Sequence, residues 1–332
     1  MTTLGEMDVN SEHILLKHGQ GFRMSAYLQE MSCYSGQAMV FEEASAFIHK
    51  YLMIEVTAKQ IERVSHHYGE QIEQVLQQDI EKGGSVKHLD AEQPHYVMPD
   101  GHMLLTREEG WKEIKMGRIF KADDRLQISP KRTQITQSLY VAHLGNHKEF
   151  EKKMECTIDG LQKIIFISDG AKWIQQWVAS MYPNHLHILD YFHAKEYLCH
   201  FAQIYFGIET DAKNKWIDEQ EKLLLEDDAG KVIKNISLLP KTRKKDKEQS
   251  RKTLIQYYQS NIKRMNYKTY RQMGLLIGSG PIEAAHRHVI QQRMKRSGQR
   301  WTKSGLQQIA NLRVVSKSNR WKEVEDMVSL AA

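Results

Sequence analysis

The sequence predicts an α/β protein in which helices flank a mixed sheet, with a helical region before the sheet and a helical insertion within it. Helical spacing of apolar residues dominates about the first 85 of the 332 residues. A strand-like period begins near residue 93, and strands then alternate with helices. A long basic helical stretch interrupts that alternation. With 41% hydrophobic and 27% charged residues, the chain has the composition of a folded protein.

The N-terminal region, residues 1–88, is expected to be helical. Thr57 and Gln60 have the spacing of a capping box, in which the threonine hydroxyl accepts a hydrogen bond from a backbone amide and the glutamine side chain reaches back. Apolar residues recur at helical spacing on both sides of this pair. Two such helices suit a helix-turn-helix for DNA binding or plain packing, and we leave both open. Residues 83–85, Gly-Gly-Ser, predict a linker.

Residues 93–197 are expected to form the first part of the sheet domain. The run from Tyr96 to Leu105 predicts a strand, a break and a second strand. The apolar run Ile164–Ile167 predicts a buried strand followed by Asp169. The other expected elements are strands at 114–120 and 137–142, a polar helix at 148–161, an amphipathic helix at 171–181, a strand at 185–190 and a helix that starts near Ala194.

The second half of the chain is expected to interrupt the sheet domain and then complete it. Residues 198–271 predict a basic helical insertion, and residues 272–315 predict the closing part of the domain. In that closing part, Gly278–Pro281 precedes a helix that should end near Gly298, because proline suits a first helical turn. Residues 316–332 are expected to be a C-terminal tail.

The positive charge of the chain is concentrated in this second half. Lys231–Lys303 contains 19 basic residues and 3 acidic ones, although the whole chain carries only +6. A solvated lysine-rich helical face would explain a single cluster, but a surplus of this size favours a nucleic-acid partner, because basic side chains release counterions from phosphates. The residues expected to contact DNA are Lys244, Lys245, Arg251, Lys252, Lys263, Arg264, Arg293, Lys295 and Arg296.

Other features exclude several classes of protein. The longest apolar runs are too short to span a bilayer, and the first residues lack the basic and apolar segments of a signal peptide. The 3 cysteines are too scattered for a disulfide framework. We therefore expect a cytoplasmic protein with no membrane partner.

Three acidic residues occupy positions where a carboxylate needs an explanation. Asp100 follows an apolar strand, Asp169 follows the most hydrophobic strand, and Glu283 is the only acid among strongly basic surroundings. If they converge, their repulsion favours a cation among them, and oxygen ligands suit Mg²⁺ or Mn²⁺. The alternative is that both aspartates make turns with the following glycines, while Glu283 interacts with the helix dipole and Arg287.

Histidines provide a rival metal site. Asp190 and His193, like Glu283 and His286, place a carboxylate and an imidazole three residues apart. Zinc or di-iron ligation is conceivable, but a di-iron bundle needs two helical Glu-x-x-His motifs, and the other match, Glu92 to His95, contains a proline and leads into a strand. Asp190, His193 and His286 are therefore assigned secondary positions beside the carboxylate site. The sequence contains no Walker A loop, no G-x-S-x-G elbow and no G-x-G-x-x-G motif.

The order of these motifs resembles a known family of enzymes. The blocks 169–173, 188–198 and 278–285, and less specifically 100–103 with 110–117, are similar to DDE transposases of bacterial insertion sequences. The nearest group is the Kra-type family, a relative of the mutator-type transposases. The resemblance covers roughly residues 30–315.

The resemblance implies an RNase H-like fold with two catalytic aspartates and a glutamate on a late helix beyond a helical insertion. Residue by residue, these are Asp100, Asp169 and Glu283, which would hold Mg²⁺ or Mn²⁺. Asp190 and His193 match a motif in which mutator-type relatives carry Cys-x-x-His, so Asp190 is the alternate second aspartate. Family members often have a cysteine-rich zinc-binding segment near the N-terminus, and this chain has no cysteine pair.

The leading hypothesis is a metal-dependent transposase that cleaves DNA at the terminal inverted repeats of its own mobile element and joins the freed 3′-hydroxyl to target DNA. It would act in a bacterial cytoplasm, on the nucleoid, as a homodimer or larger assembly on paired DNA ends. Two alternatives stay open: a catalytically inactive DNA-binding remnant of such an element, and an RNase H-like nuclease without strand transfer.

Overall fold

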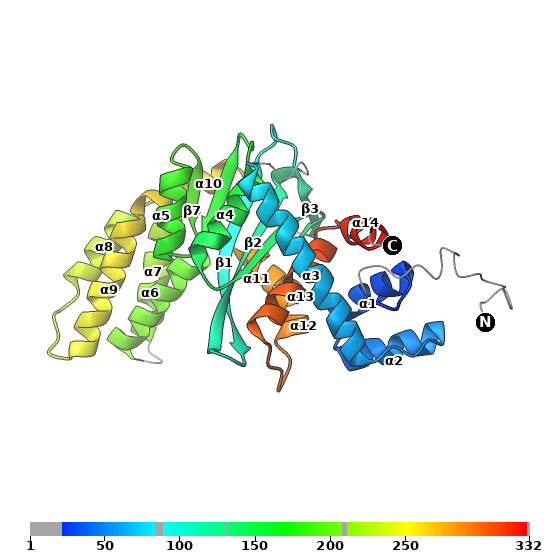
Figure 1. Cartoon of the computed structure of the whole chain (residues 1–332). Coiled ribbons are helices and arrows are strands. Elements are labelled where there is room, and N and C mark those ends of the chain that lie inside the picture. The colour runs from blue at the N-terminus through cyan, green and yellow to red at the C-terminus, as the bar shows by residue number, and fades with distance from the viewer. Residues whose placement is uncertain (1–21, 84–88, 130–131, 208–210, 331–332) are drawn as a thin grey trace, which may run out of the picture.

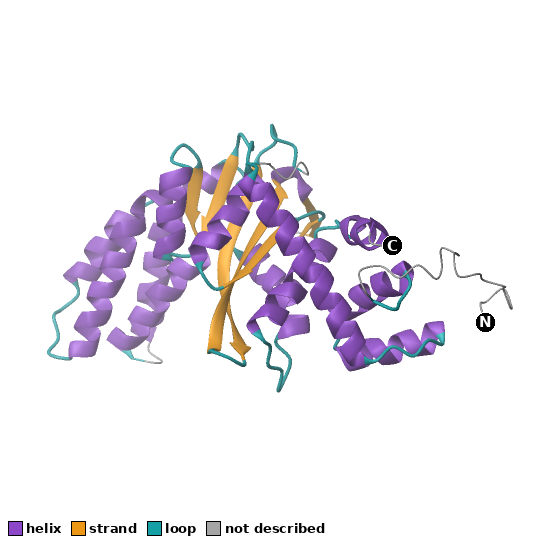
Figure 2. Ribbon diagram, in the orientation of Figure 1, coloured by secondary structure: helices purple, strands orange, loops and turns teal. Residues whose placement is uncertain are grey.

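The computed structural model describes residues 22–83, 89–129, 132–207 and 211–330. A five-stranded sheet lies at the centre of the molecule, with helices on both faces (Figures 1 and 2). The predicted α/β class with a mixed sheet is confirmed. The strands of this sheet are β1 (His95–Thr106), β2 (Gly110–Lys121), β5 (Leu139–Leu144), β6 (Ile164–Ser168) and β7 (Leu186–Leu189). The longer helices are α1 (Ala26–Ala38), α2 (Phe41–Leu52), α3 (Ala58–Glu81), α4 (His147–Ile158), α5 (Lys172–Met181), α6 (Tyr191–Phe206), α7 (Asp211–Leu225), α8 (Ala229–Leu238), α9 (Lys245–Asn261), α13 (Lys303–Lys317) and α14 (Lys322–Leu330).

The strand order is β5-β2-β1-β6-β7. β2 is antiparallel to β1 and β5, whereas β6 and β7 run parallel to β1. The pairing of β1 with β6 ends at Val97 and Phe166, and beyond it β1 continues as a long hairpin with β2. The carboxyl ends of β6 and β7 therefore meet β1 near its middle, at the position of Asp100.

Alternating side chains of the strands bury two separate cores. Val97 and Phe166 pack with α4 and α5 on one face of the sheet. Met98 and Ile167, one residue later in each strand, face the larger core on the opposite side, which includes residues of α3 and α13. Burial on both faces explains why Ile164–Ile167 reads as a continuous apolar run.

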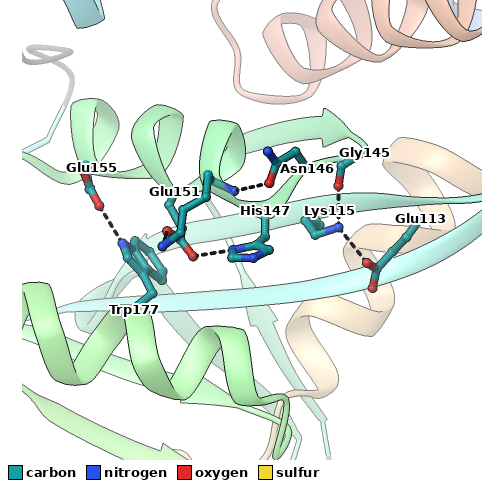
Figure 3. A network of polar contacts seen from close by, with 9 residues as sticks. Glu113, Lys115, Gly145, Asn146, His147, Glu151, Glu155 and Trp177 are labelled. Carbon is teal, nitrogen blue, oxygen red and sulfur yellow. Dashed lines mark hydrogen bonds and ion pairs between the residues drawn. The ribbon is translucent and has the colours of Figure 1, made fainter.

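Polar side chains at the edge of the smaller core join β2, α4 and α5 (Figure 3). Lys115 is only 5% exposed, and its ammonium donates to Glu113 and to the carbonyl of Gly145, each at 2.6 Å. Glu155 of α4 accepts a hydrogen bond from the indole of Trp177 in α5 at 2.7 Å. The Glu113 side chain covers Gly101, where a β-carbon would overlap it, so this network also supports the strand next to Asp100.

The helices α1, α2 and α3 form the N-terminal part, and α3 packs on α13 near the other end of the chain (Figure 1). The predicted capping box at the start of α3 is confirmed, with the Thr57 hydroxyl bonded to the Gln60 amide at 3.2 Å and the Gln60 side chain bonded to the Thr57 amide at 2.9 Å. Residues 1–21 and most of the predicted 83–85 linker lie outside the described residues.

The stretch predicted as an insertion is helical, and α6 to α9 form a group beside the sheet (Figure 1). Tyrosines hold it together: Tyr258 is buried, and its hydroxyl donates to the carbonyl of Ala194 in α6 at 2.8 Å. Tyr267 and Tyr270 are buried as well. The chain returns to the sheet through α10 (Tyr267–Gln272) and α11 (Gly280–Ala285).

Several predicted boundaries were wrong. The run from Tyr96 to Leu105 is one uninterrupted strand. Proline has no amide hydrogen to donate, but Pro99 lies beyond the last residue of β1 that pairs with β6, so no hydrogen bond to β6 is lost there. The helix expected near Ala194 begins at Tyr191. The helix after Pro281 changes into a π-helix, η5 (His286–Gln291), and ends with α12 (Gln292–Met294).

A two-stranded hairpin and the C-terminal helix were not predicted. A hairpin of β3 (Arg125–Ser129) and β4 (Arg132–Ile135) stands apart from the main sheet. The expected C-terminal tail contains α14, in which Val324 and Val328 are buried. Among the described residues, no helix combines the length and apolar character needed to cross a membrane.

We predict that Gly69→Ala lowers the free energy of unfolding by about 1–3 kcal/mol, because overpacking forces backbones apart. A β-carbon at this position in α3 would lie 2.7 Å from the carbonyl carbon of Gln308 in α13. Gly230→Ala is the control, since its β-carbon meets nothing within 4 Å and alanine should stabilise α8 by about 0.5–1 kcal/mol. Equal effects in urea unfolding would contradict the close helix crossing.

Candidate functional site

The three acids singled out in the sequence lie on three different elements at one edge of the sheet. Asp100 is in β1, three residues past its last pair with β6. Asp169 directly follows the last residue of β6. Glu283 is in the first turn of α11, after Pro281. β6 and α11 thus bring Asp169 and Glu283 toward the middle of β1.

Asp190 connects the elements that carry these acids. Its side chain is fully buried at the N-cap of α6. One carboxylate oxygen accepts the amide of Phe192 at 2.7 Å, and the other accepts the hydroxyl of Ser279 and contacts Nδ1 of His193 at 2.9 Å. Its backbone amide donates to the carbonyl of Ser168 at 2.8 Å. Asp190 therefore links the end of β6, the start of α6 and the segment that leads into α11.

The contact between Asp190 and His193 is an ion pair. Burial by itself would raise the pKa of Asp190, but the hydrogen bonds from His193 and Ser279 outweigh it and lower that pKa. The hydrogen bond to Asp190 raises the pKa of His193 to about 9, and the charges of Asp169 and Asp100 act in the same direction. The imidazole is therefore protonated at neutral pH.

Glu283 lies at the exposed side of this pair. One ligand atom from each of Asp190, His193 and Glu283 falls within 4.8 Å of the others, which is close enough to surround a metal ion. These three residues run from buried to exposed in that order. Since the Asp190 oxygens already accept three donors, Asp190 is better suited to hold the protein together than to bind a cation.

Asp169 lies close enough to the other acids to feel their charge. Burial raises its pKa, the amide of Ala171 at 3.0 Å lowers it, and the negative charges of Asp100 and Asp190 raise it again. The net shift is upward. A cation that binds nearby stabilises the ionised form of such an acid.

Asp100 is tied to the helix that carries Glu283. One of its oxygens accepts the amide of Gly101 at 2.8 Å, and the other lies 3.3 Å from Nε2 of His286. His286 is buried in η5, one turn after Glu283. The structure therefore brings Asp100 and Asp169 close enough to His193 for their charges to act on it, whereas among the described residues the group close enough to hold a metal ion is Asp190, His193 and Glu283.

The sequence analysis did not identify Tyr257 of α9 as part of this site. Its ring lies against Gly170, where a β-carbon would be 3.0 Å from the tyrosine hydroxyl. The ring stacks on Tyr197 with centroids 4.2 Å apart, and the buried hydroxyl has no partner among the described residues. The tyrosines among the lysines of the insertion were the available signal. The contact of Tyr257 with the turn after Asp169 depends on tertiary structure.

The predicted DNA-binding residues divide into an exposed and a buried group. The exposed group comprises Lys244, Lys245, Lys252, Lys263, Lys295 and Arg296. Within it, Lys295 bonds to His102 at 2.8 Å, and Arg296 pairs with Glu43 at 3.1 Å. Burial and the charge of Lys295 lower the pKa of His102 to about 4, so this histidine is a neutral acceptor.

The prediction was wrong for the exposure of three arginines. Arg251 is 5% exposed and donates to the carbonyls of Leu239 and Pro240. Arg264 is 8% exposed and bonds to His187 at 2.9 Å. Both guanidinium groups connect segments of the protein. Arg293, at 1% exposed, is buried as well, so the exposed basic surface is formed by the other six predicted residues.

A scan against protein-family models matches residues 143–328 to the model described as Uncharacterised protein family (UPF0236). This match spans more than half of the chain. The chain belongs to the UPF0236 family. The matched part includes Asp169, Asp190, His193 and Glu283, whereas Asp100 lies before it.

Curated UPF0236 proteins of Caldanaerobacter subterraneus subsp. tengcongensis are similar to this chain. Two of them are 25% identical to it over 244 residues, which is 70% of this chain and 47% or 44% of the relative. A third, 25% identical over 240 residues, has a name that joins eleven locus designations. The chain thus spans about half the length of the curated relatives it matches.

We predict that the imidazole of His193 titrates with a midpoint near pH 9, because Asp190 holds its proton. Since the folded pKa is raised, the stabilisation is complete below the unfolded value near 6.5 and is lost as the pH rises through about 9. Histidine NMR signals recorded from pH 5 to 10, assigned by their loss in His193→Gln, measure this midpoint. A midpoint at or below 6.5 would contradict the ion pair.

Proposed function

We propose that this UPF0236 protein is a DDE-type transposase that uses Asp100, Asp169 and Glu283 to cleave and join DNA. The observation that carries the proposal is the convergence of these acids, 183 residues apart at the extremes, on the ion pair of Asp190 and His193. Structural acids have no need to meet in this way, because each could form its local turn or helix contact alone.

The strand arrangement supports a relationship to RNase H-like nucleases. An antiparallel unit, β5-β2-β1, continues into two parallel strands, β6 and β7. The acids follow the pattern that the resemblance to Kra-type transposases implies: one in β1, one after the fourth strand of the sheet, and one on a late helix behind a helical insertion. We propose this finer assignment of fold and family on those grounds.

The donor set fits Mg²⁺ or Mn²⁺. Asp100, Asp169 and Glu283 offer hard carboxylate oxygens, and burial, followed by the charge of Asp100, raises the pKa of Asp169, a shift that a nearby cation would oppose. We propose these three as the metal ligands, with Asp190 as the residue that positions them. The chemistry that such ions supply when bound is activation of the attacking oxygen and stabilisation of charge on the leaving oxygen.

The proposed reaction has two steps. In the first, the oxygen of water bonds to phosphorus and the P–O3′ bond breaks, which leaves a 5′-phosphate and a free 3′-hydroxyl. In the second, this hydroxyl bonds to a phosphorus of target DNA while a target P–O3′ bond breaks, so the number of phosphodiester bonds is unchanged. The positive charge of His193 beside Asp169 offsets part of the negative charge that the phosphate brings.

The exposed lysines support the assignment of DNA as the partner. Lys244 and Lys245 are at the start of α9, Lys252 lies in its middle and Lys263 follows its end, so the helix that places Tyr257 on the Asp169 turn also carries basic charge. Such charge binds the DNA backbone without reading its sequence. Joining two element ends to one target would require at least two copies of the protein.

The relatives support a mobile element. A name that joins eleven locus designations suits a protein encoded at many places in one genome, as expected for a gene that copies itself. We propose that this chain is also encoded within an insertion sequence and acts on the nucleoid of a bacterial cell.

We predict that the purified chain nicks a supercoiled plasmid carrying the DNA that flanks its own gene, in the presence of Mg²⁺ or Mn²⁺. Asp169→Asn should reduce nicking by at least about 10³-fold, because an amide is a poor ligand and cannot offset the cation's charge. Asp123→Asn, which removes the same charge from an exposed aspartate outside the site, should leave the rate unchanged.

The products distinguish the proposal from its alternatives. Joined products with a second plasmid identify a transposase, whereas nicking without joining identifies a plain nuclease. Binding of the flanking DNA with no metal-dependent nicking identifies an inactive remnant. Nicking that survives in Asp169→Asn would refute the assigned site.

A further inference from the structure

A hollow separate from the acidic site lies between the N-terminal helices and the segment that follows α12. It measures about 360 Å³, whereas a water molecule occupies about 30 Å³, so it has room for a larger group. Its lining includes Phe41 of α2, His66 of α3, Arg107 after β1, and Arg293 and Trp301. The amide of Arg107 donates to the carbonyl of Trp301 at 2.8 Å, which fixes one wall against the end of β1.

Arg293 is a buried cation whose hydrogen-bond donors are only partly satisfied. Its guanidinium lies 4.8 and 4.9 Å from the ring centroids of Phe41 and Trp301, and Nε donates to the carbonyl of Gly36 at 3.0 Å. Nη1 and Nη2 are buried without a hydrogen-bond partner among the described residues. Cation–π contacts with these rings do not replace hydrogen bonds to the two N–H groups, which stay unsatisfied.

An unpaired buried cation is costly, and the neighbouring carboxylates do not resolve it. Glu42 and Glu62 line the hollow, yet Glu62 pairs with Lys59 at 2.6 Å, and neither makes a salt bridge with Arg293 in the described part of the chain. Burial followed by the charges of Arg313 and Arg296 lowers the pKa of Arg293 to about 10, so it stays charged at neutral pH. A group with acceptor oxygens and negative charge would satisfy it.

Other donors face the same hollow. The 12-residue helix α2 begins there, and its N-cap residue Val40 makes no side-chain bond to the first-turn amides. Helix N-termini attract anions through their free amides. Nε2 of His66 is also buried without a partner, and Arg107 and Arg300 add two exposed guanidinium groups at the edge.

We propose that this hollow is an oxyanion site that binds a phosphate group, with Arg293 and Arg107 as its principal donors. Two sources share this chemistry: a phosphate of the DNA backbone and a free phosphate compound. The site adjoins the loop that joins the Glu283 helix to α13, so an anion bound there would tie the N-terminal helices to the catalytic part of the chain. The proposal stands whether or not the protein is a transposase.

The test follows the thermal unfolding midpoint of the full chain as phosphate replaces chloride at constant ionic strength, without divalent metal. A ligand that binds the folded state raises this midpoint, and the dependence on concentration gives an apparent dissociation constant. We expect phosphate to stabilise the protein beyond chloride, and Arg107→Gln to raise the dissociation constant about tenfold, as for a lost hydrogen bond to a charged group.

Arg23→Gln is the matched control, because Arg23 is exposed, carries the same charge and lies outside the lining of the hollow. It should leave the dissociation constant within twofold. The proposal is overturned if phosphate and chloride act equally, or if both variants weaken binding to the same extent. Asp169→Asn should leave phosphate binding intact, which separates this test from that of catalysis.

A short DNA duplex added as competitor distinguishes the two sources. Displacement of phosphate by the duplex in wild type, with a loss of duplex affinity in Arg107→Gln but not in Arg23→Gln, supports a site for the DNA backbone. Phosphate binding that the duplex does not displace supports a site for a free phosphate compound.

Discussion

The structure depends on one buried carboxylate. Asp190 is shielded from water, so it is tolerable only while donors surround it, and those donors come from Phe192, His193 and Ser279. Two of them begin α6, and the third precedes α11. Satisfying a single side chain therefore brings a segment from late in the sequence to the carboxyl end of β7.

The position of the acidic site follows from this requirement. With Ser279 held at Asp190, the first turn of α11 places Glu283 beside His193, and one turn later His286 reaches Asp100. The insertion between α6 and α11 contributes directly, since Tyr257 lies against the turn after Asp169. Burial, followed by the charge of Asp100, raises the pKa of Asp169, which is the property the proposed cation would oppose.

The sequence predicted the parts of this account that depend on local patterns. Asp169 stood out because it ends an apolar run, and Asp190 and His193 because their spacing matches one helical turn. The sequence could not show that Asp190 is the buried joint, since Ser279 is distant in the chain. It also could not show that Arg251, Arg264 and Arg293 are buried, because the sequence around an arginine does not reveal whether its guanidinium faces solvent or the protein interior.

The most direct test of convergence is a crystal structure of the protein grown with Mn²⁺, whose anomalous scattering locates the ion. The account predicts an ion within about 2–2.5 Å of carboxylate oxygens from Asp169 and Glu283, with Asp100 beside it. An ion held by Asp190 and His193 without Asp169, or Glu283 turned away from a metal-free pocket, would contradict it.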